Sequence, residues 1–141
     1  MEHDVRAMRA EDYDEVIALW RSCAGIGLSD SDSREAIEAY LLRNPDMSAV
    51  ARDAEGRLVG AVLCGDDGRR GYLHHLAASP ASRGRGIARQ LLGYCFARMA
   101  SRGIPKCNIF VFRENAEGIA FWEHAGWSTR ADLTQLQKRV V

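Results

Sequence analysis

A glycine- and arginine-rich segment has the composition of an anion-binding loop. It reads Ser79-Pro80-Ala81-Ser82-Arg83-Gly84-Arg85-Gly86 and leads into an apolar helical repeat from Ile87. Glycine has no Cβ, so the backbone can turn tightly and approach an anion closely. The N–H groups and the dipole of a first helical turn then point at that anion. Since the arginines add positive charge, we expect a phosphate or pyrophosphate to bind here.

Two common phosphate-binding motifs do not fit this loop. A Walker A loop ends in Gly-Lys-Ser/Thr, which the segment lacks. A dinucleotide-binding fingerprint needs a third glycine, where this chain has Arg89, and it opens a parallel βαβ unit. Taken alone, the loop is equally compatible with a glycine turn that only leads into a core helix.

The hydrophobic pattern predicts the elements that position the loop. Period-two segments indicate strands, and apolar residues at i, i+3, i+4 and i+7 indicate helices. Gly103 is expected just past the end of the helix that follows the loop. The prediction is an α/β (α+β) fold with a mixed, mostly antiparallel sheet flanked by helices, in a single domain over 1–141. Strands are expected at 5–8, 48–52, 58–64, 72–78 and 106–112, with one or two more within 127–141. Helices are expected at 11–23, after a cap at Ser31 or Ser33, from 86 and at 115–125. The resulting order is β-α-α-β-β-β-α-β-α-β-β.

Composition excludes several classes of protein. The chain has 141 residues, of which 47% are hydrophobic and 27% charged, as in an ordinary globular domain. No apolar run is long enough to span a membrane, and the opening Met1-Glu2-His3-Asp4 predicts no signal peptide. Residues 1–67 hold 15 acids and seven bases, residues 68–141 four acids and 12 bases, and the net charge is zero. The zero net charge argues against nucleic-acid binding. The asymmetry between the halves fits a small anionic ligand, or simply a dipolar surface.

The four cysteines are Cys23, Cys64, Cys95 and Cys107. None forms a CxxC pair and none has a histidine at zinc spacing, so we expect no metal site. Each lies in an apolar segment, where a free cysteine packs as a small hydrophobic residue. This use of cysteine predicts a reducing, cytoplasmic location. For Cys107, packing is favoured over a covalent acyl-enzyme role.

Two segments together resemble the motifs of the GNAT acetyltransferases. Arg83-Gly84-Arg85-Gly86-Ile87-Ala88 matches the Arg/Gln-x-x-Gly-x-Gly/Ala motif of that family. The segment from Asn115 to Trp127 resembles its second motif, Asn-x-x-Ala-x-x-Phe-Tyr-x-x-x-Gly-Phe. The order of elements agrees over essentially the whole chain, and opening residues such as Ala18-Leu19-Trp20 look like the YpeA-like bacterial branch.

The resemblance implies a GNAT fold that binds acetyl-CoA as acetyl donor between the strands 72–78 and 106–112. The pantetheine arm is then expected to pair with the backbone of one strand, the pyrophosphate to sit on the loop amides, and Asn115 and Trp122 to touch the coenzyme. The expected coenzyme-binding residues are Leu76, Ala78, Arg83, Gly84, Arg85, Gly86, Ile87, Ala88, Asn115 and Trp122.

Acetyl transfer needs a neutral amine, and the resemblance expects a base on the strand before the loop. Neutralising a lysine-like amine at pH 7 costs about 4.6 kcal/mol. His74 occupies the expected register, with an ordinary pKa near 6.5 that suits a base, although a purely structural histidine is an equal alternative. Structural packing is preferred for His75. Alternation places Tyr72, His74, Leu76 and Ala78 on one face of the strand and Leu73, His75 and Ala77 on the other.

The chain departs from the family at Trp122, where a tyrosine usually supplies the proton for the leaving thiolate. An indole N–H cannot act as an acid at neutral pH, so the general acid is unassigned. The leading hypothesis is an acetyl-CoA-dependent N-acetyltransferase acting on a small amine or a peptide amine, as a monomer or homodimer. The alternative is an acyl-CoA binding or sensing module with little turnover. The acids Asp30 and Asp32 lie in the loop where an acceptor site is expected.

Overall fold

The computed structural model describes residues 3–141. Met1 and Glu2, which belong to the opening segment used to predict the absence of a signal peptide, lie outside the described residues. The chain divides into two compact units, Met1–Phe110 and Val111–Val141. The single domain over 1–141 therefore stays a prediction. None of the helices in the described residues is both long and apolar enough to cross a membrane.

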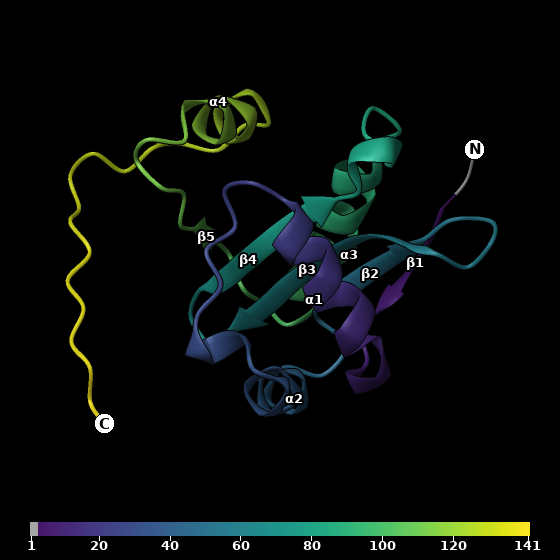
Figure 1. The fold of residues 1–141 in the computed structure, drawn as a ribbon. Coiled ribbons are helices and arrows are strands. Elements are labelled where there is room, and N and C mark those ends of the chain that lie inside the picture. The colour runs from purple at the N-terminus through teal and green to yellow at the C-terminus, as the bar shows by residue number, and fades with distance from the viewer. Residues whose placement is uncertain (1–2) are drawn as a thin grey trace. The chain divides into compact units, whose positions relative to one another are not determined.

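The first unit is built on one five-stranded sheet with the order β1-β2-β3-β4-β5 (Figure 1). Neighbouring strands from β1 to β4 pair antiparallel, and β4 pairs with β5 parallel. This confirms the predicted mixed, mostly antiparallel sheet. The bounds are β1 Asp4–Ala7, β2 Ala49–Arg52, β3 Leu58–Asp66, β4 Gly71–Ala78 and β5 Cys107–Ile109.

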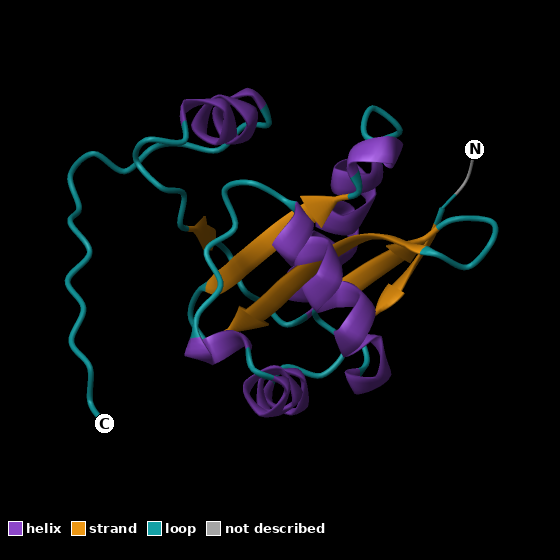
Figure 2. Cartoon of the chain, viewed as in Figure 1, coloured by secondary structure: helices purple, strands orange, loops and turns teal. Residues whose placement is uncertain are grey.

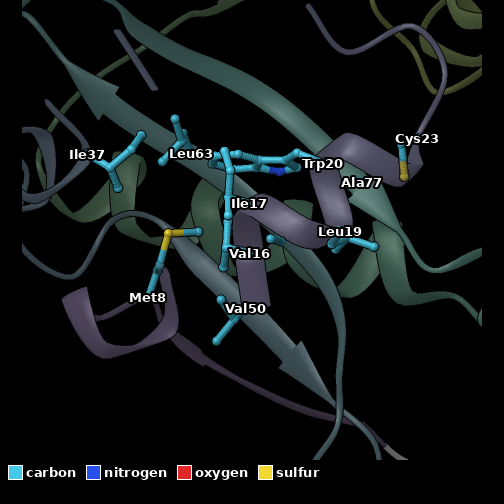
Figure 3. Packing of buried hydrophobic residues seen from close by; sticks show 11 residues of the cluster. Met8, Val16, Ile17, Leu19, Trp20, Cys23, Ile37, Val50, Leu63 and Ala77 are labelled. Carbon is cyan, nitrogen blue, oxygen red and sulfur yellow. The ribbon is translucent and has the colours of Figure 1, made fainter. Parts of the chain in front are cut away.

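Helices cover both faces of this sheet. Trp20 and Val16 of α1 (Tyr13–Ser22) are fully buried against Ala61 and Leu63 of β3, in the cluster drawn in Figure 3. A side chain at Gly60 of β3 would point to the opposite face of the sheet, because a Cβ built there would lie 2.6 Å from Ile87. α3 (Ile87–Ser101) therefore lies on the opposite face from α1, and α2 (Arg34–Arg43) packs on the α1 side through Ile37.

Local signals set the helix ends as expected. Of the two candidate caps for α2, Ser33 is the N-cap, and its hydroxyl accepts a hydrogen bond from the Ala36 N–H. At the end of α3, Gly103 has φ +76° and the Ile104 N–H donates to the Met99 carbonyl at 3.0 Å. This is the glycine-terminated helix end that the sequence predicts, with Pro105 next in the chain.

The second unit contains α4 (Ala116–His124) and an extended tail. The expected one or two closing strands are wrong: residues 127–141 are described throughout and contain no strand, and Figure 2 draws them as loop. The tail is polar, and its apolar residues do not alternate, since Leu133 and Leu136 are three apart. With Leu136 90% exposed, the segment has no apolar face to bury as a strand.

Candidate functional site

The loop before α3 has the backbone geometry that an anion-binding turn requires. Gly84 and Gly86 have φ of +81° and +77°, the left-handed region that favours glycine. Gly86 is the N-cap of α3 and offers no side chain, and the first helical bond runs from the Gln90 N–H to the Gly86 carbonyl at 3.0 Å. The N–H groups of the first turn therefore have no capping side chain, as a helix N-terminus that receives an anion requires.

Charge and anchoring support the same reading of the loop. Arg83, Arg85 and Arg89 are all exposed, and no Asp or Glu occurs between Asp67 and Glu114 in the sequence. Ile87, the first residue of α3, is buried against β3, so the turn is fixed to the sheet. A rigid, positively charged helix N-terminus fits a pyrophosphate.

The strand before this loop loses its parallel partner part-way along. Pairing between β4 and β5 runs from Gly71↔Cys107 to Leu73↔Ile109 and stops there. β4 continues to Ala78, so in the described residues no strand pairs with this edge beyond Leu73. This unpaired edge leads to the loop and includes Leu76 and Ala78, the residues expected to bind the pantetheine arm.

A β-bulge at His75 changes which side chains share a face. Leu63 and Ala61 are two residues apart on β3, but their partners on β4, His74 and Ala77, are three apart. His75 takes up the extra residue with φ +56°. The expected common face of His74 and Ala78 is therefore wrong: Ala77 shares the face of His74, and Ala78, paired with Gly60, turns toward α3.

His74 lies in an aromatic cluster. Its ring stacks near Tyr72 and Phe110, with centroids 6.5 and 6.3 Å away, and meets the edge of Tyr40. Burial lowers the pKa of His74 below its ordinary value, and nearby His75 lowers it further. A neutral imidazole at pH 7 can accept a proton, which keeps His74 a candidate base.

His75 forms a hydrogen bond with Asp32 that the sequence did not predict. Its Nε2 lies 3.0 Å from Oδ1 of Asp32, which is 6% exposed and belongs to the short 3-10 helix η2 (Asp30–Asp32). Its ring meets the edge of Trp20 at 4.9 Å. The acidic loop and the double histidine were both visible in the sequence. The bulge that turns His75 toward the loop carries no sequence signal.

The cysteines occupy packing positions. Cys23, Cys64 and Cys95 are buried, and Cys107 is half-buried with a pKa raised to about 12, mainly by burial. A thiol with this pKa is protonated at neutral pH and is a poor nucleophile. In the described residues, no group of three or more His, Cys, Asp or Glu is arranged to hold a metal ion.

The remaining expected coenzyme residues lie in the second unit. The Oδ1 of Asn115 caps α4 by accepting the Gly118 N–H at 3.0 Å. Trp122 is half-buried and packs against the rings of Phe121 and Trp127. Their contacts with the coenzyme stay predictions.

Comparison with known proteins decides the family. Residues 13–127 match the model of the acetyltransferase (GNAT) family. The chain is a GNAT acetyltransferase. It is 34% identical over 138 residues to an acetyltransferase of Sodalis glossinidius, covering 98% of this chain and 96% of that protein. These matches confirm the family and the enzyme class inferred from the two motifs.

Solved GNAT structures show the same fold. The enzyme resembles Ard1 of Thermoplasma volcanium with a TM-score of 0.81, at 16% identity, over 93% of this chain and 86% of that one. It also resembles the PaiA N-acetyltransferase of Thermoplasma acidophilum, solved with coenzyme A, with a TM-score of 0.80 at 22% identity. That match covers 92% of each chain. The likeness confirms the GNAT fold class.

Proposed function

We propose that this GNAT protein transfers the acetyl group of acetyl-CoA to a primary amine by direct attack on the thioester. The observation that carries the proposal is the N-terminus of α3. The segment between β4 and α3 has two left-handed glycines and three exposed arginines, and the first turn of α3 has no side-chain cap. Together these features favour the binding of an anion. The relative solved with coenzyme A supports the same donor.

The coenzyme contacts follow the chain from β4 into α3. We assign the pyrophosphate to the backbone N–H groups from Arg83 to Ala88, and the pantetheine arm to the unpaired edge at Leu76 and Ala78. The first group binds through the helix dipole and charge, and the second through strand-like pairing. Asn115 and Trp122 complete the proposed contacts from α4.

The bound coenzyme supplies an electrophilic thioester carbonyl. The acceptor ammonium first loses a proton, and its nitrogen then bonds to the carbonyl carbon as the C–S bond breaks. The second nitrogen proton leaves with the thiolate, so the products are an amide and a thiol. His74 is the sequence-based candidate for the first proton, directly or through water, because its lowered pKa leaves it neutral at pH 7.

We place the reaction in the cytoplasm of a bacterium, with a small amine or a peptide amine as acceptor. The four cysteines are free, as in a reducing compartment. The matching relative from Sodalis glossinidius is bacterial.

A second candidate function is an acyl-CoA binding or sensing module with little turnover. The observation that favours it is Trp122, which stands where a family tyrosine would protonate the thiolate. An indole N–H is not acidic enough for that step. In the enzyme, water is then proposed to relay the second nitrogen proton to the thiolate.

Thiol release from acetyl-CoA separates the two candidates. The purified protein is mixed with acetyl-CoA and a panel of amines with high and low pKa, alongside calorimetry of coenzyme binding. Amine-dependent release of thiol supports the enzyme. Binding of acetyl-CoA without release for any amine supports the sensor, and no binding at all overturns both.

A further inference from the structure

The carboxylate of Asp32 is held on both sides. Its Oδ1 pairs with His75 Nε2 at 3.0 Å, and its Oδ2 accepts the Ser29 N–H at 3.0 Å. The Asp32 carbonyl also accepts the hydroxyl of Tyr13 at 2.7 Å. With both oxygens bonded and only 6% of the residue exposed, this carboxylate is a fixed hydrogen-bond acceptor for the imidazole.

The backbone of His75 presents the ring to this carboxylate. A non-glycine residue with φ +56° is uncommon, and such conformations concentrate at functional sites. The bulge lies just beyond the last β4–β5 pair, at the start of the unpaired edge. The His75 side chain is 18% exposed while that of Asp32 is 6% exposed, so part of the imidazole reaches solvent.

We propose that His75, oriented by Asp32, accepts the proton of the acceptor amine in place of His74, the candidate that the sequence suggested. An ionised carboxylate fixes the imidazole proton on Nε2 and leaves the lone pair on Nδ1. The same carboxylate stabilises the imidazolium that forms when Nδ1 takes a proton. Trp20, fully buried against the ring, lowers the local dielectric and strengthens this pair. His75 is the catalytic residue in this assignment, and Asp32 is a positioning residue.

The proton balance is closed. Nδ1 of His75 takes one proton from the ammonium, which frees the lone pair for attack on the thioester carbon. The N–C bond forms, the C–S bond breaks, and the second nitrogen proton goes to the thiolate. The imidazolium then returns its proton to water. No oxidant, metal or further reactant is needed.

Asp32→Asn tests the pair with little change in shape. The asparagine oxygen can accept the Ser29 N–H, and its amide can donate to Nε2. That donation moves the His75 proton to Nδ1 and removes the lone pair. We expect kcat/KM for a lysine-like amine to fall by about 10²–10⁴, the range for loss of a general base, through kcat more than KM. The loss should shrink for an amine of low pKa, because less deprotonation is required.

The matched controls are His75→Asn and His74→Asn. Asparagine tolerates the left-handed backbone at His75 and keeps a donor toward Asp32, but it has no basic nitrogen. His75→Asn should match the loss in Asp32→Asn, with acetyl-CoA affinity unchanged, whereas His74→Asn should lose much less. Unchanged turnover in Asp32→Asn, a loss equal for amines of all pKa, or a large loss confined to His74→Asn would each overturn the proposal.

The inference rests on the proposed acetyl transfer, and the two fail differently. If the wild type releases no thiol with any amine, the proposed function fails. If the wild type turns over but Asp32→Asn behaves like it, only the role of the pair fails. Should Asp32→Asn not fold, NMR of the wild-type His75 nitrogens replaces it, read together with turnover of His75→Asn. A protonated Nδ1 in the resting enzyme, or full turnover of His75→Asn, contradicts the assignment.

Discussion

Gly86→Ala, paired with Gly103→Ala, isolates the role of the loop before α3. The two glycines lie at opposite ends of the same helix, with φ of +77° and +76°. No atom lies within 4 Å of a Cβ built at either position. Alanine at either therefore meets no clash and only the cost of a left-handed backbone, about 1–2 kcal/mol. Both variants should unfold about 3–8 °C below the wild type.

The affinity for acetyl-CoA should differ between Gly86→Ala and Gly103→Ala. An alanine that relaxes out of the left-handed region turns the first-turn N–H groups of α3 away from the phosphates. Losing one hydrogen bond to a charged group costs about 1.5–3 kcal/mol, which is roughly 10- to 150-fold in Kd. Calorimetry with acetyl-CoA should show this loss for Gly86→Ala and a Kd within about twofold of wild type for Gly103→Ala. Equal affinities in the two variants would refute the assignment of this loop.

Three further predictions concern the first unit. Gly60→Ala should lower the free energy of unfolding, measured in urea, by about 1–3 kcal/mol, because the new Cβ crowds Ile87. As the control, Gly93→Ala in α3 places a Cβ in open space and should raise it by about 0.5–1 kcal/mol. Folding lowers the pKa of His74, so the native state binds fewer protons than the unfolded state, and the free energy of unfolding should fall as the pH drops below about 6.5. His74→Phe should flatten this dependence on pH. The same pH dependence in the variant and the wild type would contradict the prediction. With a pKa of about 12, roughly one in 10⁴ Cys107 thiols is ionised at pH 8. A thiol reagent should therefore label Cys107 slowly in the native protein and fast in guanidinium-unfolded protein. Rapid labelling of the native protein would contradict the burial of this thiol.

The sequence predicted the features that local chemistry sets. The glycine turn before Ile87, a serine cap of α2 (Ser33 of the two candidates) and the Gly103 helix end each follow from one residue's backbone preference or hydrogen bonding. The apolar periods predicted the meander and the helices on its faces, and the two motifs predicted the family.

The features that the sequence did not predict depend on long-range pairing. The bulge at His75 comes from the register between β3 and β4, which alternation alone cannot reveal. It reversed the expected faces beyond His74 and brought His75 to Asp32, 43 residues earlier in the chain. The prediction of strands within 127–141 was wrong because this polar segment has no alternation of apolar and polar residues.

The most direct test of the central claim is the mass of the acceptor after reaction. The wild type, acetyl-CoA and a primary amine are incubated together, and product mass is read alongside free thiol. Direct N-acetyl transfer predicts an acceptor heavier by one acetyl group for each thiol released, with both signals reduced in Gly86→Ala at limiting acetyl-CoA. An unchanged acceptor mass with every amine of the panel, while acetyl-CoA still binds, would contradict it.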